Sequence, residues 1–214
     1  SACLVGSERG IRDRLKELTA KESDRLDAKL VRSREMYGKA REHLCNGVAS
    51  SYQLRDPWPI YVDHGEGSRV WDVDGNEYYD FHNGFGAMVQ GHANPVIGEA
   101  VNTRFAKGTH FALPDEDDFV VAGELSERFG LPKWRYTNSG SESTMDAIRI
   151  ARAYTHRDPI MKIFGSYHGH HDAVMISIAE DYDKIGDRLH LRSLPYGAGI
   201  PAATIPLTVP VPFN

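Results

Sequence analysis

The sequence predicts an α/β fold in which helices accompany a small antiparallel sheet and a mostly parallel one. Three observations lead to this class: helical apolar spacing in a charge-dense N-terminal stretch, short β-rich runs after it, and strand–helix–strand alternation beyond residue 114. We therefore expect three segments. They are an N-terminal helical arm at residues 1–46, a small β/α segment at 47–113, and part of a larger domain at 114–214.

The N-terminal arm mixes charges of both signs over residues 7–44. Its apolar residues recur three or four positions apart, as on one face of a helix. A narrow apolar stripe of this kind favours docking on a partner surface. The stripe consists of Ile11, Leu15, Leu18, Leu26, Leu30, Met36, Ala40 and Leu44.

Within the second segment the pattern changes from Pro57. The stretch "PIYVDHGEGSRVWDVDGNEYYDF" has short β-rich runs that predict a small antiparallel meander. We expect a break at His64–Gly65 and a hairpin turn at Asp74–Gly75. The glycines of "NGFGAMVQGHANP" then indicate loops. The stretch "VIGEAVNTRFAKG" predicts a helix that ends near Gly108.

The third segment alternates helix and strand. Acidic residues open a predicted helix, "DEDDFVVAGELSERFG", which closes on Gly130. The next three elements are a strand at "KWRYTN", a helix at "SESTMDAIRIARAYTHR" and a strand at "PIMKIFG", which together indicate a parallel sheet covered by helices. Five prolines after Leu194 predict a connector without a central strand. They are Pro195, Pro201, Pro206, Pro210 and Pro212.

Charge and cysteine content limit the kinds of partner and cellular location that we expect for this protein. With 25 basic and 30 acidic residues the formal net charge is -5, which argues against a nucleic-acid binder. No apolar stretch reaches the length of a membrane span, and no signal peptide is apparent. Cys3 and Cys45 cannot build a disulfide framework. We expect a cytoplasmic protein with small-molecule or protein partners.

The turn "TNSGSES" carries the strongest local signal. Ser139, followed three residues later by Glu142, predicts a capping box at the start of a helix. This explains neither Gly140 nor Ser141. Glycine allows a ligand to approach the backbone, and a helix N-terminus favours an anion. A bound phosphate and a plain helix cap both remain open from these residues alone.

A second cluster, "GSYHGHHDA", follows the "PIMKIF" strand at the edge where parallel sheets bind ligands. Tyr167 offers a ring face to a flat ligand. The alternatives are a half-buried aromatic residue and local hydrogen bonds from His168, His170 and His171. A zinc site is disfavoured because adjacent histidines do not easily reach one metal and no cysteine pair supports them. We therefore expect no metal.

The sequence resembles the class III aminotransferases of fold type I, and among them the glutamate-1-semialdehyde aminomutases. The likeness rests on "YTNSGSESTMDAIRIARAYTHRDPIMKIFGSYHGHHD", "SREMYGKAREHLCNGVASS", "VWDVDGNEYYDFHNGFGAMVQGHANPVI" and "KGTHFALPDEDD", and it runs from Ser33 to Asn214. It implies that residues 114–214 are the first part of the large domain that binds pyridoxal 5'-phosphate (PLP). It also implies a homodimer.

The resemblance implies roles for individual residues. Gly140 and Ser141 occupy the phosphate-binding positions, with Ser139 before them in the same turn. Tyr167 matches the tyrosine that stacks on the PLP ring, and His168 continues that motif. The substrate-binding positions of the aminomutase fall on Ser50, Gln53 and Phe85.

Two departures from the family pattern bear on activity. Gln53 stands where the aminomutase has an arginine for the substrate carboxylate, which favours a transaminase for another amino donor, with a keto acceptor. The resemblance also places the Schiff-base lysine and the aspartate that pairs with the pyridine nitrogen in a C-terminal half beyond Asn214. We therefore expect no catalytic residue proper in this chain and no activity without that half.

Three alternatives to this transaminase reading remain. The chain belongs to an aminomutase of the glutamate-1-semialdehyde type, it is a shortened PLP-binding or regulatory subunit without catalysis, or it is an unrelated α/β module that binds phosphate. No lysine has the setting expected of the cofactor's anchor. The lysines are Lys16, Lys21, Lys29, Lys39, Lys107, Lys133, Lys162 and Lys184.

Overall fold

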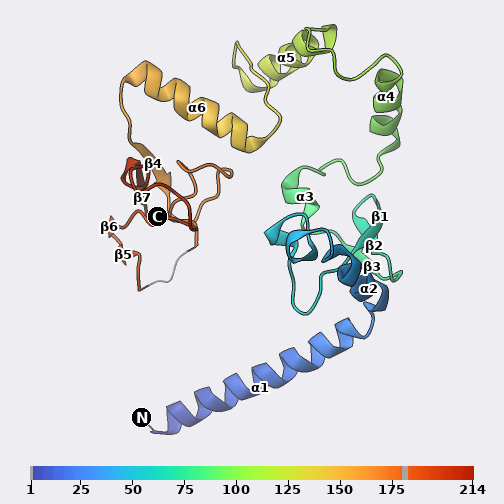
Figure 1. The fold of residues 1–214 in the computed structure, drawn as a ribbon, viewed down its shortest axis with the longest axis vertical. Coiled ribbons are helices and arrows are strands. Elements are labelled where there is room, and N and C mark those ends of the chain that lie inside the picture. Colours follow the sequence, from blue (N-terminus) through green and yellow to red (C-terminus); the bar gives the residue numbers. More distant parts are fainter. Residues whose placement is uncertain (1, 180–182) are drawn as a thin grey trace. The chain divides into compact units, whose positions relative to one another are not determined.

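The computed structural model describes residues 2–179 and 183–214 (Figure 1). The chain divides into two compact units, Ser1–Ala112 and Leu113–Asn214. The first unit contains the long N-terminal helix and a three-stranded sheet, and the second contains two longer helices and two small sheets. The predicted α/β class is confirmed.

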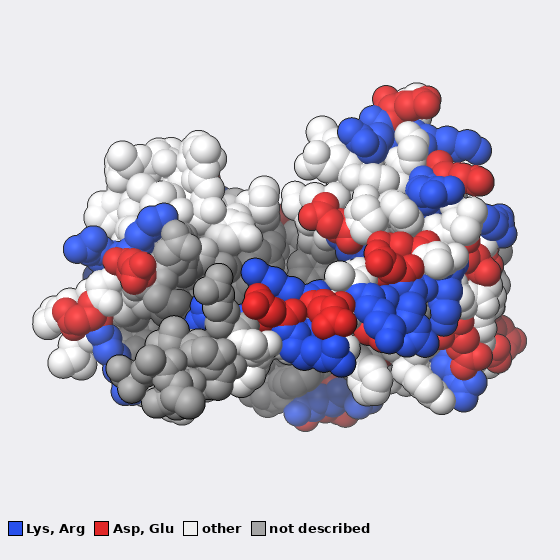
Figure 2. Space-filling view, turned by 90° about the horizontal axis from the view of Figure 1, so that it is seen from below, with Lys and Arg blue, Asp and Glu red and all other residues white. Residues whose placement is uncertain are grey.

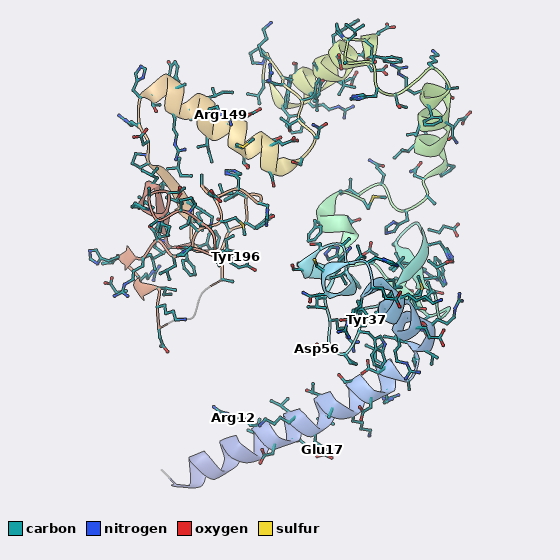
Figure 3. The ribbon with its side chains drawn as sticks, viewed as in Figure 1. Arg12, Glu17, Tyr37, Asp56, Arg149 and Tyr196 are labelled. Carbon is teal, nitrogen blue, oxygen red and sulfur yellow. The ribbon has the colours of Figure 1, made fainter. Side chains whose placement is uncertain are left out.

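Two helices form where the charge-dense sequence predicts them, α1 at Ala2–Asp27 and α2 at Val31–Ala40. Side chains such as Arg12 and Glu17 project from α1 (Figure 3), and Arg14 forms an ion pair with Glu17 at 2.8 Å. On the face shown in Figure 2, basic and acidic side chains lie interspersed. The apolar residues Ile11 and Leu15 are exposed on α1, so this helix presents its stripe to the surroundings.

The N-terminus of α2 is closed by a carboxylate from a distant turn. Asp74 accepts hydrogen bonds from the backbone N–H of Arg32 at 2.6 Å and from that of Ser33 at 3.0 Å. It also accepts one from the Ser33 hydroxyl at 2.7 Å. Burial opposes the charge, but the hydrogen bonds from Arg32 and Ser33 outweigh it and lower the pKa of Asp74. Leu30, fully buried at 0% exposure, fixes the start of the helix.

The predicted meander is present as β1 (Val62–Glu66), β2 (Arg69–Asp72) and β3 (Glu77–Tyr79), paired antiparallel in that order. The chain turns between β2 and β3 at Asp74–Gly75, as expected, with Gly75 at φ +83°. The expected break at His64–Gly65 is wrong. Both residues belong to β1, whose pairing register shifts between Val62 and His64, and the chain turns instead at Gly67 with φ +55°.

Four short elements complete the first unit: η1 (Cys45–Gly47), η2 (Ser51–Gln53), α3 (Asn83–Gly86) and α4 (Pro95–Phe105). The turn α3, in a stretch expected to be loop, is left-handed, with φ angles from +51° at Asn83 to +87° at Gly86. The Asn94 side chain caps α4 by accepting the Val96 N–H at 3.0 Å.

The second unit begins with α5 (Glu116–Phe129) and α6 (Gly140–Thr155). As expected, acidic residues open α5, with Asp115 as its N-cap, and Gly130 ends it with φ +68°. The strand expected at residues 133–138 is absent. Within the described part of the chain this stretch has no ladder partner, and the Tyr136 hydroxyl ties it to Asp118 O at 2.9 Å.

The expected parallel pairing is present, but with an unexpected partner. The strand β4 (Ile160–Ile163) pairs in parallel with β7 (Thr208–Val211), in the proline-rich stretch predicted to be only a connector. The Phe164 N–H donates to Val211 O at 2.8 Å. Odd-numbered residues of β7 therefore bond to β4, and the nitrogen of Pro210, which lacks a proton, faces the other edge.

Two further small elements lie in the second unit, the ribbon of β5 (Gly186–Asp187) with β6 (His190–Leu191) and the 3-10 turn η3 (Ile205–Leu207). Val174 and Ile176 are buried in this unit, and Lys162 is only 5% exposed. Burial lowers the pKa of the Lys162 ammonium.

Large apolar side chains stay exposed on this unit. They include Phe119 on α5, Ile150 on α6 and Met161 on β4. Among the described helices none has the length and apolar character needed to cross a bilayer.

Candidate functional site

Ser139 caps the N-terminus of α6, as the sequence predicts. Its hydroxyl oxygen accepts the Glu142 N–H at 3.2 Å. The carboxylate of Glu142 reaches back one residue further than expected, accepting the Asn138 N–H at 2.7 Å and the Ser139 hydroxyl at 3.3 Å. The helix therefore begins at Gly140 with a cap made by its own sequence.

This cap leaves the first two amides of the helix open. The first four N–H groups of an α-helix have no acceptor within the helix. Here Glu142 donates to Ser139 Oγ and Ser143 to Ser139 O. For the amides of Gly140 and Ser141 no acceptor lies among the described residues. Together with the positive end of the helix dipole, they form an anion-binding turn.

A loop that follows β4 packs directly on this turn. The His170 N–H donates to the Ser141 hydroxyl oxygen at 2.8 Å. Gly169, at φ +110°, comes so close that a Cβ atom built on it would lie 2.7 Å from Ser141 Cα. Only glycine fits there. Since Ser141 Oγ already accepts one bond, its own proton remains available to a ligand.

The helix turn and the loop line one pocket. All five residues predicted to bind a cofactor contribute to its wall, and Tyr167 is 61% exposed. Thr144 also lines it and was not predicted. It lies three residues after Ser141, on the same helix face, and that spacing could have identified it. The lining residues are Ser139, Gly140, Ser141, Thr144, Tyr167, His168 and Gly169.

Thr144 joins the helix to the loop. Its hydroxyl oxygen lies 2.7 Å from His168 O and 3.1 Å from His171 Nε2. Burial lowers the pKa of the His171 imidazole, while the nearby Asp172 carboxylate acts in the opposite direction. In the described ranges, 2–179 and 183–214, no three His, Cys, Asp or Glu side chains gather closely enough to hold a metal ion.

The residues predicted to contact substrate lie in the first unit. The Ser50 N–H donates to Gln53 Oε1 at 3.2 Å, so the carboxamide oxygen of Gln53 closes its own turn. Phe85 is 75% exposed and lies in the left-handed turn α3. The centroid of its ring is 4.8 Å from that of Tyr52, a residue that lies between Ser50 and Gln53 in the sequence. Tyr52 thus connects the two predicted segments, a contact that no local sequence pattern indicates.

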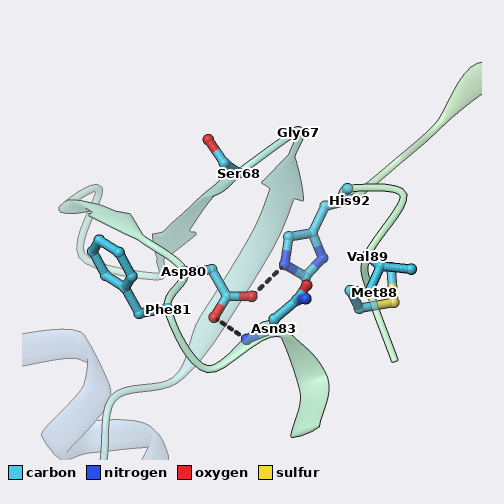
Figure 4. A pocket seen from close by; sticks show the side chains of 9 residues that line it. Gly67, Ser68, Asp80, Phe81, Asn83, Met88, Val89 and His92 are labelled. Atoms are coloured by element: carbon cyan, nitrogen blue, oxygen red, sulfur yellow. Dashed lines mark hydrogen bonds and ion pairs between the residues drawn. The ribbon is translucent and has the colours of Figure 1, made fainter. Parts of the chain in front are cut away.

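A polar pair holds the start of the turn that carries Phe85 (Figure 4). Asp80 Oδ2 lies 2.7 Å from His92 Nε2, while Asp80 Oδ1 accepts the N–H groups of His82 at 2.9 Å and Asn83 at 2.8 Å. The hydrogen bond with His92, followed by that from Asn83, lowers the pKa of Asp80. This carboxylate compensates the strain of a left-handed backbone at Asn83 and Phe85.

Comparison with known proteins identifies relatives along most of the chain. The family model described as "Aminotransferase class-III" matches residues 51–210. Glutamate-1-semialdehyde 2,1-aminomutase from Archaeoglobus fulgidus is 38% identical over 187 residues. That match covers 87% of this chain and 43% of the relative. The chain thus spans less than half the length of the relatives it matches.

Solved structures likewise match most of this chain but less than half of their own length. An omega-transaminase from Sphaerobacter thermophilus superimposes with a TM-score of 0.80 at 38% identity, over 85% of this chain and 41% of that one. A glutamate-1-semialdehyde aminomutase from Pseudomonas aeruginosa gives a TM-score of 0.79 at 29% identity. It covers 94% of this chain and 43% of the other.

Proposed function

The chain belongs to the class III aminotransferase family, and from this premise we propose that it holds the phosphate and one ring face of PLP in an enzyme that transfers amino groups. The observation that carries the proposal is the open N-terminus of α6. Two amides and the Ser141 hydroxyl converge on one pocket. Relatives of similar structure are described as a transaminase with PLP bound and as an aminomutase in complex with PMP.

In the proposed site, Gly140 and Ser141 bind the phosphate dianion through their backbone amides, and Ser141 adds its hydroxyl proton. Ser139 keeps the helix start in place. Gly140 leaves space for the ligand, since nothing lies within 4 Å of a Cβ built on it. The residues present therefore fit a phosphate group.

Tyr167 and His168 line the same pocket beside the phosphate positions. We assign Tyr167 the ring-stacking role, because its ring is exposed on the pocket side of a loop that is anchored to α6. When bound, PLP supplies an electron sink for the carbanion formed during amino transfer. The residues of this chain orient that ring and exclude water from one face of it.

The substrate wall of the proposed enzyme includes Ser50, Gln53 and Phe85. The carboxamide of Gln53 carries no charge, and its oxygen is already used by Ser50 N–H. It cannot replace the bidentate contact that an arginine makes with a carboxylate. This supports a transaminase that takes an amino donor and a keto acceptor other than the aminomutase substrate.

An aminomutase of the glutamate-1-semialdehyde type is the second candidate. It is supported by the 38% identity to the Archaeoglobus fulgidus aminomutase. The two candidates differ in one measurable respect. An aminomutase moves the amino group within a single substrate, whereas a transaminase releases a keto product before the acceptor binds.

We further propose that these 214 residues do not complete the reaction alone. The chain spans about 43% of the Archaeoglobus fulgidus relative, and none of its lysines lies in the pocket that Ser139 and Tyr167 line. An anchoring lysine and a carboxylate for the ring nitrogen would come from further residues. A homodimer and a cytoplasmic location are part of the same proposal, and a non-catalytic PLP-binding subunit is its main rival.

The experiment combines binding with a half-reaction. PLP is added to the purified intact protein, and binding is followed by visible absorbance and by competition with inorganic phosphate. A panel of amino donors is then tested for conversion of bound PLP to its aminated form. Both measurements are made on these 214 residues alone and on the complete protein, with the further residues that would supply the lysine. Binding that phosphate displaces, with conversion by the complete protein and not by the 214 residues alone, supports the enzyme. Binding without conversion in either form supports the regulatory subunit, and the absence of binding contradicts the proposal.

A further inference from the structure

The hydroxyl of Thr144 has more neighbours than it has protons. Its oxygen lies 2.7 Å from His168 O, 3.1 Å from Gly140 O and Ser141 O, and 3.1 Å from His171 Nε2. Three of these four neighbours are backbone carbonyls, which only accept. His171 Nε2 is the one neighbour that can act as either donor or acceptor.

The short contact with His168 decides where the proton lies. Two oxygen atoms 2.7 Å apart without a proton between them would repel each other, and a carbonyl cannot provide that proton. The Thr144 hydroxyl therefore donates to His168 O. Its lone pair faces His171 Nε2, which must then carry a hydrogen in order to donate.

We propose that Thr144 and His171 are positioning residues, in which the Nε2–H of neutral His171 donates to Thr144 Oγ1 and Thr144 donates to His168 O. The bridge holds the backbone of His168, and with it the neighbouring Tyr167, against the start of α6. The tautomer follows from the contacts alone. The consequence for cofactor binding rests on the proposed function.

The surroundings of His171 favour the neutral ring. The imidazole is partly buried, and burial lowers its pKa. Among the charged groups, the Asp172 carboxylate favours protonation and the Arg152 guanidinium opposes it. A neutral histidine with Nε2–H leaves Nδ1 as an acceptor.

The bridge complements a second attachment of the same loop. The His170 N–H donates to Ser141 Oγ at 2.8 Å, and Gly169 packs against Ser141. Ser141 thus holds the loop on one side of His168 and Thr144 holds His168 itself. Removing either attachment gives Tyr167 and His168 freedom to leave the geometry that lines the pocket.

The first test reads the tautomer without any ligand. Nitrogen chemical shifts of His171, recorded by NMR on the intact protein at about pH 8, where a neutral imidazole is present, are expected to show a protonated Nε2 and an unprotonated Nδ1. In Thr144→Val the preference is expected to relax toward a mixture. A wild-type spectrum with the proton on Nδ1 overturns the proposal.

The second test measures PLP affinity in a matched set. Thr144→Val removes the hydroxyl at nearly constant shape, and Thr144→Ser retains it. Thr155→Val removes a hydroxyl on the same helix whose one partner among the described residues is Ala151 O, at 2.7 Å. We expect Thr144→Val to weaken PLP binding about tenfold, which corresponds to about 1.4 kcal/mol. Thr144→Ser and Thr155→Val should stay within about twofold of the wild type.

The outcomes separate this inference from the proposed function. If the wild type binds no PLP, the proposed function fails, while the His171 spectrum still decides the tautomer. If the wild type binds PLP and Thr144→Val binds equally well, the positioning role is overturned. Loss of binding in Thr144→Ser as well as in Thr144→Val would also overturn it, because the hydroxyl would then not be the feature that matters.

Discussion

Two helix N-termini in this chain differ in whether the protein itself supplies acceptors for their first amides. At α2 the amides of Arg32 and Ser33 are closed by the carboxylate of Asp74, which comes from a turn 42 residues away from Arg32. At α6 the cap is local, made by Ser139 and Glu142, and the amides of Gly140 and Ser141 have no acceptor in the described part of the chain. The same backbone geometry thus serves as an anchor in one unit and is open to an anion in the other.

The difference shows how a binding turn is distinguished from a structural one. A helix start attracts negative charge in both cases. What matters is whether the protein supplies that charge itself. At α2 it does, so the Asp74 carboxylate joins the helix to the turn between β2 and β3. At α6 the Glu142 carboxylate instead accepts the Asn138 N–H and the Ser139 hydroxyl, so the amides of Gly140 and Ser141 have no charged acceptor among the described residues.

The largest effect is expected when a negative charge is placed at the open N-terminus of α6. Ser141→Asp places a carboxylate where we propose that the phosphate dianion binds, and like charges in contact cost several kcal/mol. We expect PLP affinity to fall by more than about a thousandfold, equivalent to about 4 kcal/mol. Fluorescence titration of the intact protein with PLP measures the loss.

The companion variant Ser141→Ala loses one hydroxyl donor and should weaken PLP binding about tenfold. Thermal unfolding serves as the control, because an aspartate in the first turn of a helix does not destabilise it. If Ser141→Asp binds PLP like the wild type, α6 is not the phosphate site.

The converse experiment removes the carboxylate that closes the N-terminus of α2. Asp74→Ala removes three hydrogen bonds to a charged acceptor, and we expect the free energy of unfolding of the first unit to fall by about 3 kcal/mol. Urea titration followed by far-UV circular dichroism measures this. Asp63→Asn is the matched control, since that carboxylate is mostly exposed and its ion pair within the described residues is with the neighbouring His64.

The pH dependence of the same carboxylate sharpens the test. The folded state lowers the pKa of Asp74, so its contribution to stability is present above the ordinary aspartate pKa and disappears as the pH falls through the lowered value. Asp74→Ala should show a flatter loss of stability in acid than the wild type. An identical acid profile for both proteins would contradict the role of Asp74 as a charged cap.

Two glycines at the open terminus should respond in opposite directions. Gly169→Ala forces a Cβ against Ser141 at a φ of +110°, and we expect it to cost about 2 kcal/mol of stability and to weaken PLP binding. Gly140→Ala meets open space in the first turn of a helix, where alanine is favoured over glycine by up to about 1 kcal/mol. Unfolding midpoints of the pair test the contact, and equal effects would contradict it.

The smallest expected effect is the change in stability with pH that comes from protonation of His171. Its folded pKa lies below the ordinary histidine value because of burial, so its contribution to stability is complete above about pH 6.5 and is lost as the pH falls below that value. His171→Gln, which retains a donor, should remove this slope between about pH 7.5 and 5.5. Urea midpoints of the two proteins across that interval make the comparison.

Much of the architecture follows from local signals. Ser139, Asp115 and Gly130 each end or begin a helix where their chemistry predicts it. The turn at Asp74–Gly75 also lies as expected. The five residues predicted from the two motifs of the second unit line one pocket. They could be predicted because local sequence patterns indicated both the end of a strand and the start of a helix.

The errors share a cause. Residues 133–138 have the composition of a strand, and residues 208–211 contain a proline that disfavours one, yet only the second stretch forms a strand. A strand needs a partner at hydrogen-bonding distance, and local composition does not reveal which segment arrives. The spacing of Thr144 from Ser141 could have placed it on the pocket side of the helix, but its contacts with His168 and His171 join residues 24 and 27 positions away and have no local signal.

The sequence by itself determined where α5 and α6 start and where α5 ends, because a local cap satisfies backbone groups within a few residues of its own position. Only the tertiary structure decided that Asp74 closes α2, that β7 lies beside β4, and that Thr144 bridges His168 and His171. These contacts join groups far apart in the chain. Their geometry exists only after folding has brought the groups together, so no local pattern records it.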